Sequence, residues 1–106
     1  MRQGITERHW NDMQGRPEGG HTFGVGFAIA WQRGPLGRGD LRDPANGAFV
    51  EDIIAAAIGR IEFYQASEFA CLENADALEA LKHAATRLAE RTKAREARGV
   101  EGTHAT

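Results

Sequence analysis

Cysteine, net charge and long apolar runs are all scarce in this chain, and each scarcity excludes a class of protein. The one cysteine, Cys71, excludes a disulfide framework within a chain. Thirteen basic residues against fifteen acidic ones give a net charge of −2, which does not favour a general binder of nucleic acid polymers or membranes. No run approaches the roughly 20 apolar residues of a membrane span, and Met1 to Trp10 lacks the apolar stretch of a signal peptide. We therefore expect a cytosolic protein.

Motifs for catalysis and metal binding are missing as well. The four histidines have no metal-ligand spacing with one another or with Cys71, so we expect no metal and no cofactor. The sequence contains no GxxxxGK[ST] phosphate loop and suggests no nucleophile–histidine arrangement. Gly24 and Gly26 form a GxG inside a strand pattern, but a dinucleotide fold requires a helix directly afterwards. We expect that the protein is not an enzyme.

The chain length of 106 residues allows one domain, residues 1–106, with a thin core. Small domains often compensate for a thin core by forming oligomers, so we expect a homo-oligomer. The pattern along the chain predicts an α+β fold. Residues 1–47 form a small antiparallel β element with loops, and residues 48–106 form a long helical hairpin with a C-terminal tail.

The clearest strand pattern covers Thr22 to Gln32. Large side chains occupy the odd positions from Phe23 to Trp31, and Gly or Ala dominates the even positions. A period of two predicts a strand, with the large residues on its buried face. A second, short extended piece is expected around Gly4 to His9, because a strand needs a partner.

Two helices are predicted after the turn-rich segment 33–47. The first runs from about Ala48 to Gln65, with Asn46 as its N-cap and a broad apolar stripe. The second runs from about Ala70 to Arg98. Its apolar residues recur at spacings of three and four, which indicates a seam for packing against other helices. A very short turn joins the two helices into a hairpin.

Asn74 interrupts the apolar seam of the second helix. On a helical wheel it falls on the same side as Leu78, Leu81 and Leu88. A polar side chain at such a position needs a hydrogen-bond partner. Two interpretations stay open, because Asn74 can cap or set the register of the helix, or it can contact a ligand.

Basic residues crowd the second half of the same helix. Arg91 and Arg95 are i,i+4 neighbours that flank the seam. One interpretation is a favourable interaction with the C-terminal end of the helix dipole. The other is a pair of guanidinium groups for a phosphate or pyrophosphate. The tail around Thr103 contains two glycines that let backbone amides approach an anion, or it is a frayed end.

Phe63 and Tyr64 end the first helix, and either aromatic ring can pack in the core or stack on a nucleobase. They lie with Asn74 near the tip of the hairpin. Arg91 is 17 residues beyond Asn74, which corresponds to roughly 25 Å along a helix. These residues can share a pocket only if two hairpins pack antiparallel, which predicts a C2 dimer with two identical pockets.

Several stretches resemble the first family of phage Thoeris anti-defence proteins, and the helical hairpin is similar to that of phage anti-CBASS sponges. The resemblance covers about Ala48 to His104 and is most specific at its C-terminal end. Its stretches are Gly47–Glu51, Glu62–Gln65, Phe69–Asn74, Arg91–Thr92 and Arg95–His104.

This resemblance implies a sponge that captures cyclic ADP-ribose isomers in the cytoplasm of the bacterial host and releases them uncleaved. Some members also bind cyclic di- or trinucleotides at a separate site. Members assemble as dimers, or as hexamers built as trimers of dimers, with the pocket between subunits. The site residues implied for this chain are Phe63 or Tyr64, Asn74, Arg91, Arg95, Arg42 and Thr103.

Two other functions stay open. A helical-hairpin module that binds protein or nucleic acid through its arginines would lose affinity steeply with salt and show no dependence on nucleotide size. An enzyme that degrades the signal would not return intact ligand. The polar Asn74 within the seam favours the sponge, because a plain interaction helix has no need of it.

Overall fold

The computed structural model describes residues 4–106, which divide into two compact units. The first unit, called the sheet unit, contains the chain up to Phe49 together with the tail Gly99–Thr106. The second unit is the helical hairpin, Val50–Arg98. The predicted α+β fold is therefore confirmed. The tail belongs to the sheet unit, although it follows the hairpin in sequence.

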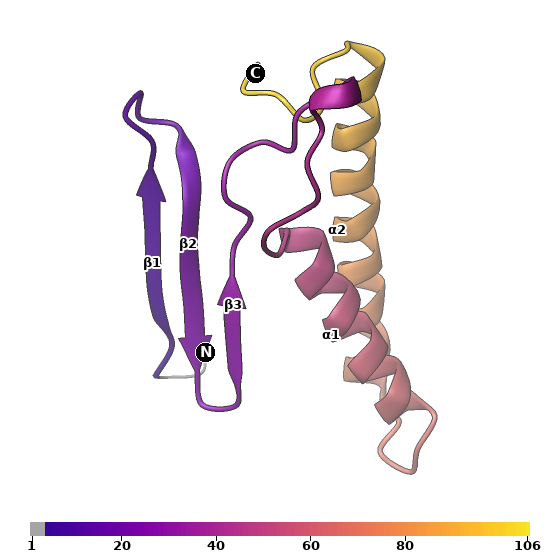
Figure 1. Ribbon diagram of the computed structural model, residues 1–106. Helices are drawn as coiled ribbons and strands as arrows, with labels where there is room; N and C mark the ends of the chain where they lie inside the picture. Colours follow the sequence, from indigo (N-terminus) through magenta and orange to yellow (C-terminus); the bar gives the residue numbers. More distant parts are fainter. Residues whose placement is uncertain (1–3) are drawn as a thin grey trace. The chain divides into compact units, whose positions relative to one another are not determined.

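A three-stranded antiparallel sheet forms the first part of the sheet unit (Figure 1). Its strands are β1 (Thr6–Asn11), β2 (Pro17–Gly24) and β3 (Phe27–Ala30), in the spatial order β1-β2-β3. The extended piece expected at Gly4 to His9 is present as β1, and β2 begins earlier than the sequence pattern indicated. The predicted antiparallel β element is confirmed.

The prediction of one continuous strand from Thr22 to Gln32 is wrong. The chain turns at Val25 and Gly26, so that Gly24 faces Phe27 across a hairpin. Gly26 has φ +89°, the left-handed conformation that glycine adopts at the third position of a type II turn. The alternating pattern continues through this turn, because a two-residue loop fits between two strands without disturbing the period of two.

This turn also reverses the predicted faces of the residues that precede Phe27, whereas the large residues of β3 lie on the covered face as predicted. Partners across the ladder share a face, so Phe27, Ile29 and Trp31 lie on the same side as Gly24 and Thr22. The Phe27 ring covers Gly24, where an added Cβ would lie 2.8 Å from the ring. Thr22 is buried, and its hydroxyl accepts a 2.8 Å hydrogen bond from the Trp31 indole.

Phe23 and Val25 point away from that covered face. Phe23 is 44% exposed and Val25 is 83% exposed, although both were expected on a buried face. The small even residues of β2 are the covered ones, because they make room for the large odd residues of β3.

The loop after β3 returns the chain to the sheet, where Ala48 lies beside the residue that follows β3 and runs parallel to it. Ala48 forms a parallel bridge with Trp31, and its amide donates to the carbonyl of Ala30 at 2.7 Å. The Asn46 side chain bonds to both backbone groups of Arg33, at 2.8 and 3.1 Å. Asn46 is therefore not the N-cap predicted for the first helix, which begins four residues later at Val50.

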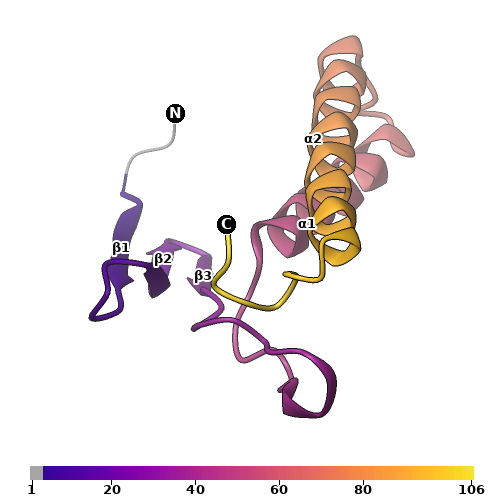
Figure 2. The same cartoon turned by 90° about the horizontal axis from the view of Figure 1, so that it is seen from above.

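The hairpin unit consists of α1 (Val50–Gln65) and α2 (Leu72–Ala97), which lie side by side in both views (Figures 1 and 2). Both helices agree with the sequence prediction to within two residues at each end. The Gln65 side chain closes the connector, because its amide donates to the Cys71 carbonyl and its oxygen accepts from the Cys71 amide. This pairing fixes the short turn that joins the helices.

Apolar side chains in residues 4–106 are at best half-buried, and none is fully buried. On α1 the half-buried stripe follows isoleucines from Ile53 to Ile61, and on α2 it follows leucines from Leu78 to Leu88. Each helix therefore keeps part of its apolar stripe in contact with solvent in a single chain. Among the described residues, no helix is both long enough and apolar enough to cross a membrane.

Candidate functional site

The half-buried stripe of α2 is apolar in its middle and polar at its ends. Asn74 begins it, in the first turn of the helix, and Arg95 ends it, in the last turn. Between them Leu78, Leu81 and Leu88 continue the same stripe at spacings of three, four and seven residues. The predicted place of Asn74 within the seam is therefore confirmed.

The two basic candidates lie one turn apart on α2. Arg91 is exposed, and Arg95 is half-buried on the stripe itself. Because α2 is continuous from Leu72 to Ala97, Asn74 and Arg95 are separated by about 31 Å at 1.5 Å per residue. A single hairpin does not bring these two ends together.

The aromatic candidates occupy the last turn of α1, beside the connector. Phe63 is 62% exposed and Tyr64 is 37% exposed, with ring centroids 6.1 Å apart and planes tilted by 57°. Asn74 lies in the first turn after the same connector. The structure therefore places the aromatic candidates and Asn74 at one end of the hairpin, and Arg91 and Arg95 at the other end of α2.

Sequence reasoning missed Arg60, which contacts both aromatic rings. Its guanidinium carbon lies 4.9 Å from the centroid of Phe63 and 4.9 Å from that of Tyr64. Its Nε also donates a 3.0 Å hydrogen bond to the Tyr64 hydroxyl. The signal was present in the sequence, since Arg60 precedes the two rings by three and four residues, the spacing of neighbours on a helix.

Arg42 and Thr103 lie in the sheet unit, where the C-terminal tail runs along the loop before α1 (Figure 2). The two terminal nitrogens of Arg42, Nη1 and Nη2, donate to the Glu101 carboxylate at 2.7 and 3.3 Å. Thr103 donates its hydroxyl to the Val100 carbonyl at 2.6 Å. Gly102 passes so close to Gly37 that a Cβ there would collide with the Gly37 carbonyl.

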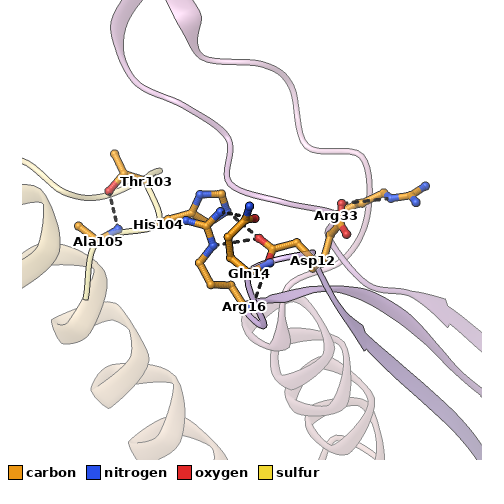
Figure 3. A network of polar contacts seen from close by, with 8 residues as sticks. Asp12, Gln14, Arg16, Arg33, Thr103, His104 and Ala105 are labelled. Carbon is orange, nitrogen blue, oxygen red and sulfur yellow. Dashed lines mark hydrogen bonds and ion pairs between the residues drawn. The ribbon is translucent and has the colours of Figure 1, made fainter.

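A second polar cluster joins the β1–β2 turn to the tail (Figure 3). Asp12 accepts hydrogen bonds from the backbone amides of Arg16 and Gln14, and from the Arg16 side chain at 2.9 Å. His104 lies 3.9 Å from the same carboxylate. The backbone amide of Arg16 is the main cause that lowers the pKa of Asp12, and partial burial opposes the shift. The hydrogen bonds of Asp12 order the β1–β2 turn.

Within residues 4–106, no group of three or more His, Cys, Asp or Glu side chains is arranged to hold a metal ion.

A small antiparallel sheet followed by a helical hairpin with polar ends defines a class of small α+β proteins. Over 76 residues the chain is 53% identical to the protein named Thoeris anti-defense 1 from Bacillus phage SBSphiJ7. The chain belongs to the Thoeris anti-defence family. The match covers 72% of this chain and 51% of the phage protein, so the chain spans about half the length of that relative. No protein-family model matches the chain.

Proposed function

We propose that the protein is a counter-defence sponge that binds cyclic ADP-ribose-type signals between two copies of the chain and releases them uncleaved. In this proposal it acts in the cytoplasm of the bacterial host and blocks Thoeris signalling. The observation that carries the proposal is that the apolar stripe of α2 has a half-buried polar residue at each end, Asn74 at one end and Arg95 at the other. Membership of the Thoeris anti-defence family supports the biological role.

The stripe itself supports a second copy as the partner. Its midpoint lies between Ala84 and Ala85, which are both half-buried. A two-fold axis at these small residues lets two α2 helices approach closely in antiparallel orientation. Asn74 of one copy then lies opposite Arg95 of the other. The same contact covers Leu78, Leu81 and Leu88, which a single chain leaves half-exposed.

The resulting residue set suits a nucleotide signal. Phe63 or Tyr64 offers a ring for stacking on adenine, and Asn74 offers an amide that can donate to and accept from the base edge. Arg91 and Arg95 of the other copy supply two guanidinium groups for a pyrophosphate. A ligand enclosed between two subunits loses most of its solvent contact and dissociates slowly, which is what sequestration requires.

The exposed tip of the hairpin agrees with this arrangement. Phe63, Phe69 and Leu72 are 62%, 70% and 72% exposed in the single chain. Apolar side chains gathered at one place on a surface favour contact with another molecule. In the proposed dimer, the basic end of the partner's α2 approaches this tip. Further association of dimers into a hexamer stays a prediction.

Arg42 and Thr103 are proposed as further contacts of the bound signal, and cyclic di- or trinucleotides are proposed to bind at a separate site. The Arg42 guanidinium already pairs with Glu101 at 2.7 Å. An anionic ligand must therefore replace that carboxylate, so a Glu101→Gln variant is expected to bind a cyclic ADP-ribose isomer more tightly than the wild type. Titrations of the two ligand classes against each other distinguish one shared site from two.

The test is a calorimetric titration of the purified protein with cyclic ADP-ribose isomers and cyclic di- and trinucleotides, followed by heat denaturation and analysis of the released ligand. Asn74→Leu is expected to weaken binding about 5-fold to 100-fold, because it removes a hydrogen bond worth about 1–3 kcal/mol in a desolvated site. The same change completes the apolar stripe and raises the melting temperature. A control is Arg87→Gln, which removes an exposed arginine paired with Glu90.

A mixing experiment tests the intersubunit pocket directly. Asn74→Ala and Arg91→Ala are each expected to abolish tight binding. A mixed dimer of the two variants regains one intact pocket, so co-refolding restores about one quarter of the wild-type sites. A pocket within one chain regains none. Failure of the wild type to bind any ligand of the panel contradicts the sponge and favours the helical interaction module.

A further inference from the structure

Arg60 makes three contacts with the two aromatic candidates. Its guanidinium carbon lies at the same distance, 4.9 Å, from the Phe63 and Tyr64 centroids. Its Nε donates to the Tyr64 hydroxyl at 3.0 Å. Both cation–π contacts lie within the range of about 6 Å in which a guanidinium is attracted to a ring face. A single cation therefore holds both rings at once.

No acidic side chain among the described residues competes with the two aromatic rings for the Arg60 guanidinium. Among residues 4–106, no carboxylate forms an ion pair with Arg60. Arginine is suited to this place because its planar group stacks on a ring and donates in the same plane. A lysine at position 60 keeps the charge but loses both the planar stack and the Nε donor.

We infer that Arg60 is a positioning residue of the candidate ligand site, which holds Phe63 and Tyr64 in the orientation that a nucleobase meets. This inference rests on the proposed sponge function. Phe63 is 62% exposed, so its ring would otherwise sample several rotamers. Ordering such a side chain on binding lowers affinity, and a ring that is already fixed avoids this loss.

The arrangement also separates the roles of the two rings. The hydrogen bond fixes the Tyr64 hydroxyl, so the phenol is held at both its face and its edge. Phe63 is held at one face only, and it is the more exposed of the two rings. The structure therefore assigns Phe63 the stacking contact and Tyr64 the contact that fixes Arg60.

Tyr64 provides a direct spectroscopic report, because it is the only tyrosine in the chain. In protein labelled with ¹³C only in tyrosine, the ring ¹H–¹³C signals come from Tyr64 alone. We would record these signals for the full chain without ligand, for the wild type, Arg60→Gln and Arg60→Lys. The same three proteins would be titrated with the tightest-binding cyclic ADP-ribose isomer. Arg87→Gln serves as the control, since it also removes one exposed arginine from the hairpin.

The expected result has two parts. Arg60→Gln moves the Tyr64 ring signals and raises the Kd about tenfold, the size expected from two surface cation–π contacts and a hydrogen bond. Arg60→Lys gives a smaller increase in Kd, because it retains the charge. Arg87→Gln changes neither the ring signals nor the Kd.

The inference and the proposed function fail in different ways. A wild type that binds the ligand, with the same Kd as Arg60→Gln, overturns the role of Arg60 and leaves the sponge intact. Unchanged Tyr64 signals in Arg60→Gln overturn it as well, because the ring is then not held by Arg60. A wild type that binds nothing overturns both, since no site is left for Arg60 to organise.

Discussion

The interactions that stabilise the sheet unit internally differ in kind from those that stabilise the helical hairpin internally. In the sheet unit, Asp12, Asn46 and Arg42 bond to particular groups of neighbouring turns, loops or tail. In the hairpin, stripes of isoleucine and leucine pack against each other, and the exposed Lys82–Glu62 ion pair adds little. Directional hydrogen bonds are completed within the chain, whereas an apolar stripe is left half-covered and can be completed by a second copy.

The largest expected effect tests whether the hairpin stripe is covered in solution. Leu81→Ala is expected to lower the free energy of unfolding by about 2–5 kcal/mol if a second copy buries the side chain. Chemical denaturation at several protein concentrations measures the loss and its dependence on association. The matched control is Leu41→Ala in the sheet unit, where the leucine is 83% exposed, with an expected change within about 0.5 kcal/mol. Equal losses in the two variants would contradict a covered stripe.

An intermediate effect is expected within the sheet unit. Thr22→Val preserves the shape of the side chain but removes the acceptor of the half-buried Trp31 indole. The expected loss is about 1–3 kcal/mol, the usual result of leaving a donor unsatisfied. Thermal denaturation followed by tryptophan fluorescence measures it, with Thr6→Val on exposed β1 as the control. No difference between the two variants would mean that the bond contributes nothing.

The smallest expected effect is a decrease in the free energy of unfolding at acidic pH. Hydrogen bonds lower the pKa of Asp12 below its ordinary value of 3.8. The stabilisation is therefore complete above that value and is lost as the pH falls through the lower native pKa, because the unfolded chain binds the proton first. The free energy of unfolding, measured by chemical denaturation between about pH 5 and about pH 2, should depend less on pH in Asp12→Asn than in the wild type. Asp43→Asn, in an exposed loop, should follow the wild-type curve.

The hairpin was predictable from sequence, and the sheet unit was predictable only in part. The residue pattern of a helix lies within one segment of the chain. Periodicity therefore predicted α1, α2 and the place of Asn74 on the α2 stripe. Pairing between strands is not local, and the turn at Val25 and Gly26 keeps the alternation intact. The sequence pattern therefore could not reveal where one strand became two.

The candidate site shows the same division. The separation of Asn74 from Arg91 followed from the length of the predicted second helix, whereas the contact of Arg42 with Glu101 joins residues 59 positions apart. No local pattern predicts such a long-range pair. Arg60 could have been found by its spacing from Phe63 and Tyr64, but an arginine on an exposed helix face is usually only solvated.

The two-residue turn between Gly24 and Phe27 also restricts how this family can change in length. An insertion of one residue there, without a compensating bulge, would shift every side chain of β3 to the opposite face. Phe27, Ile29 and Trp31 would then leave the positions over Gly24, Thr22 and Gly20. Two residues would restore the original parity. Relatives that retain Phe27, Ile29 and Trp31 should therefore differ at this turn by even numbers of residues, or carry a bulge beside it.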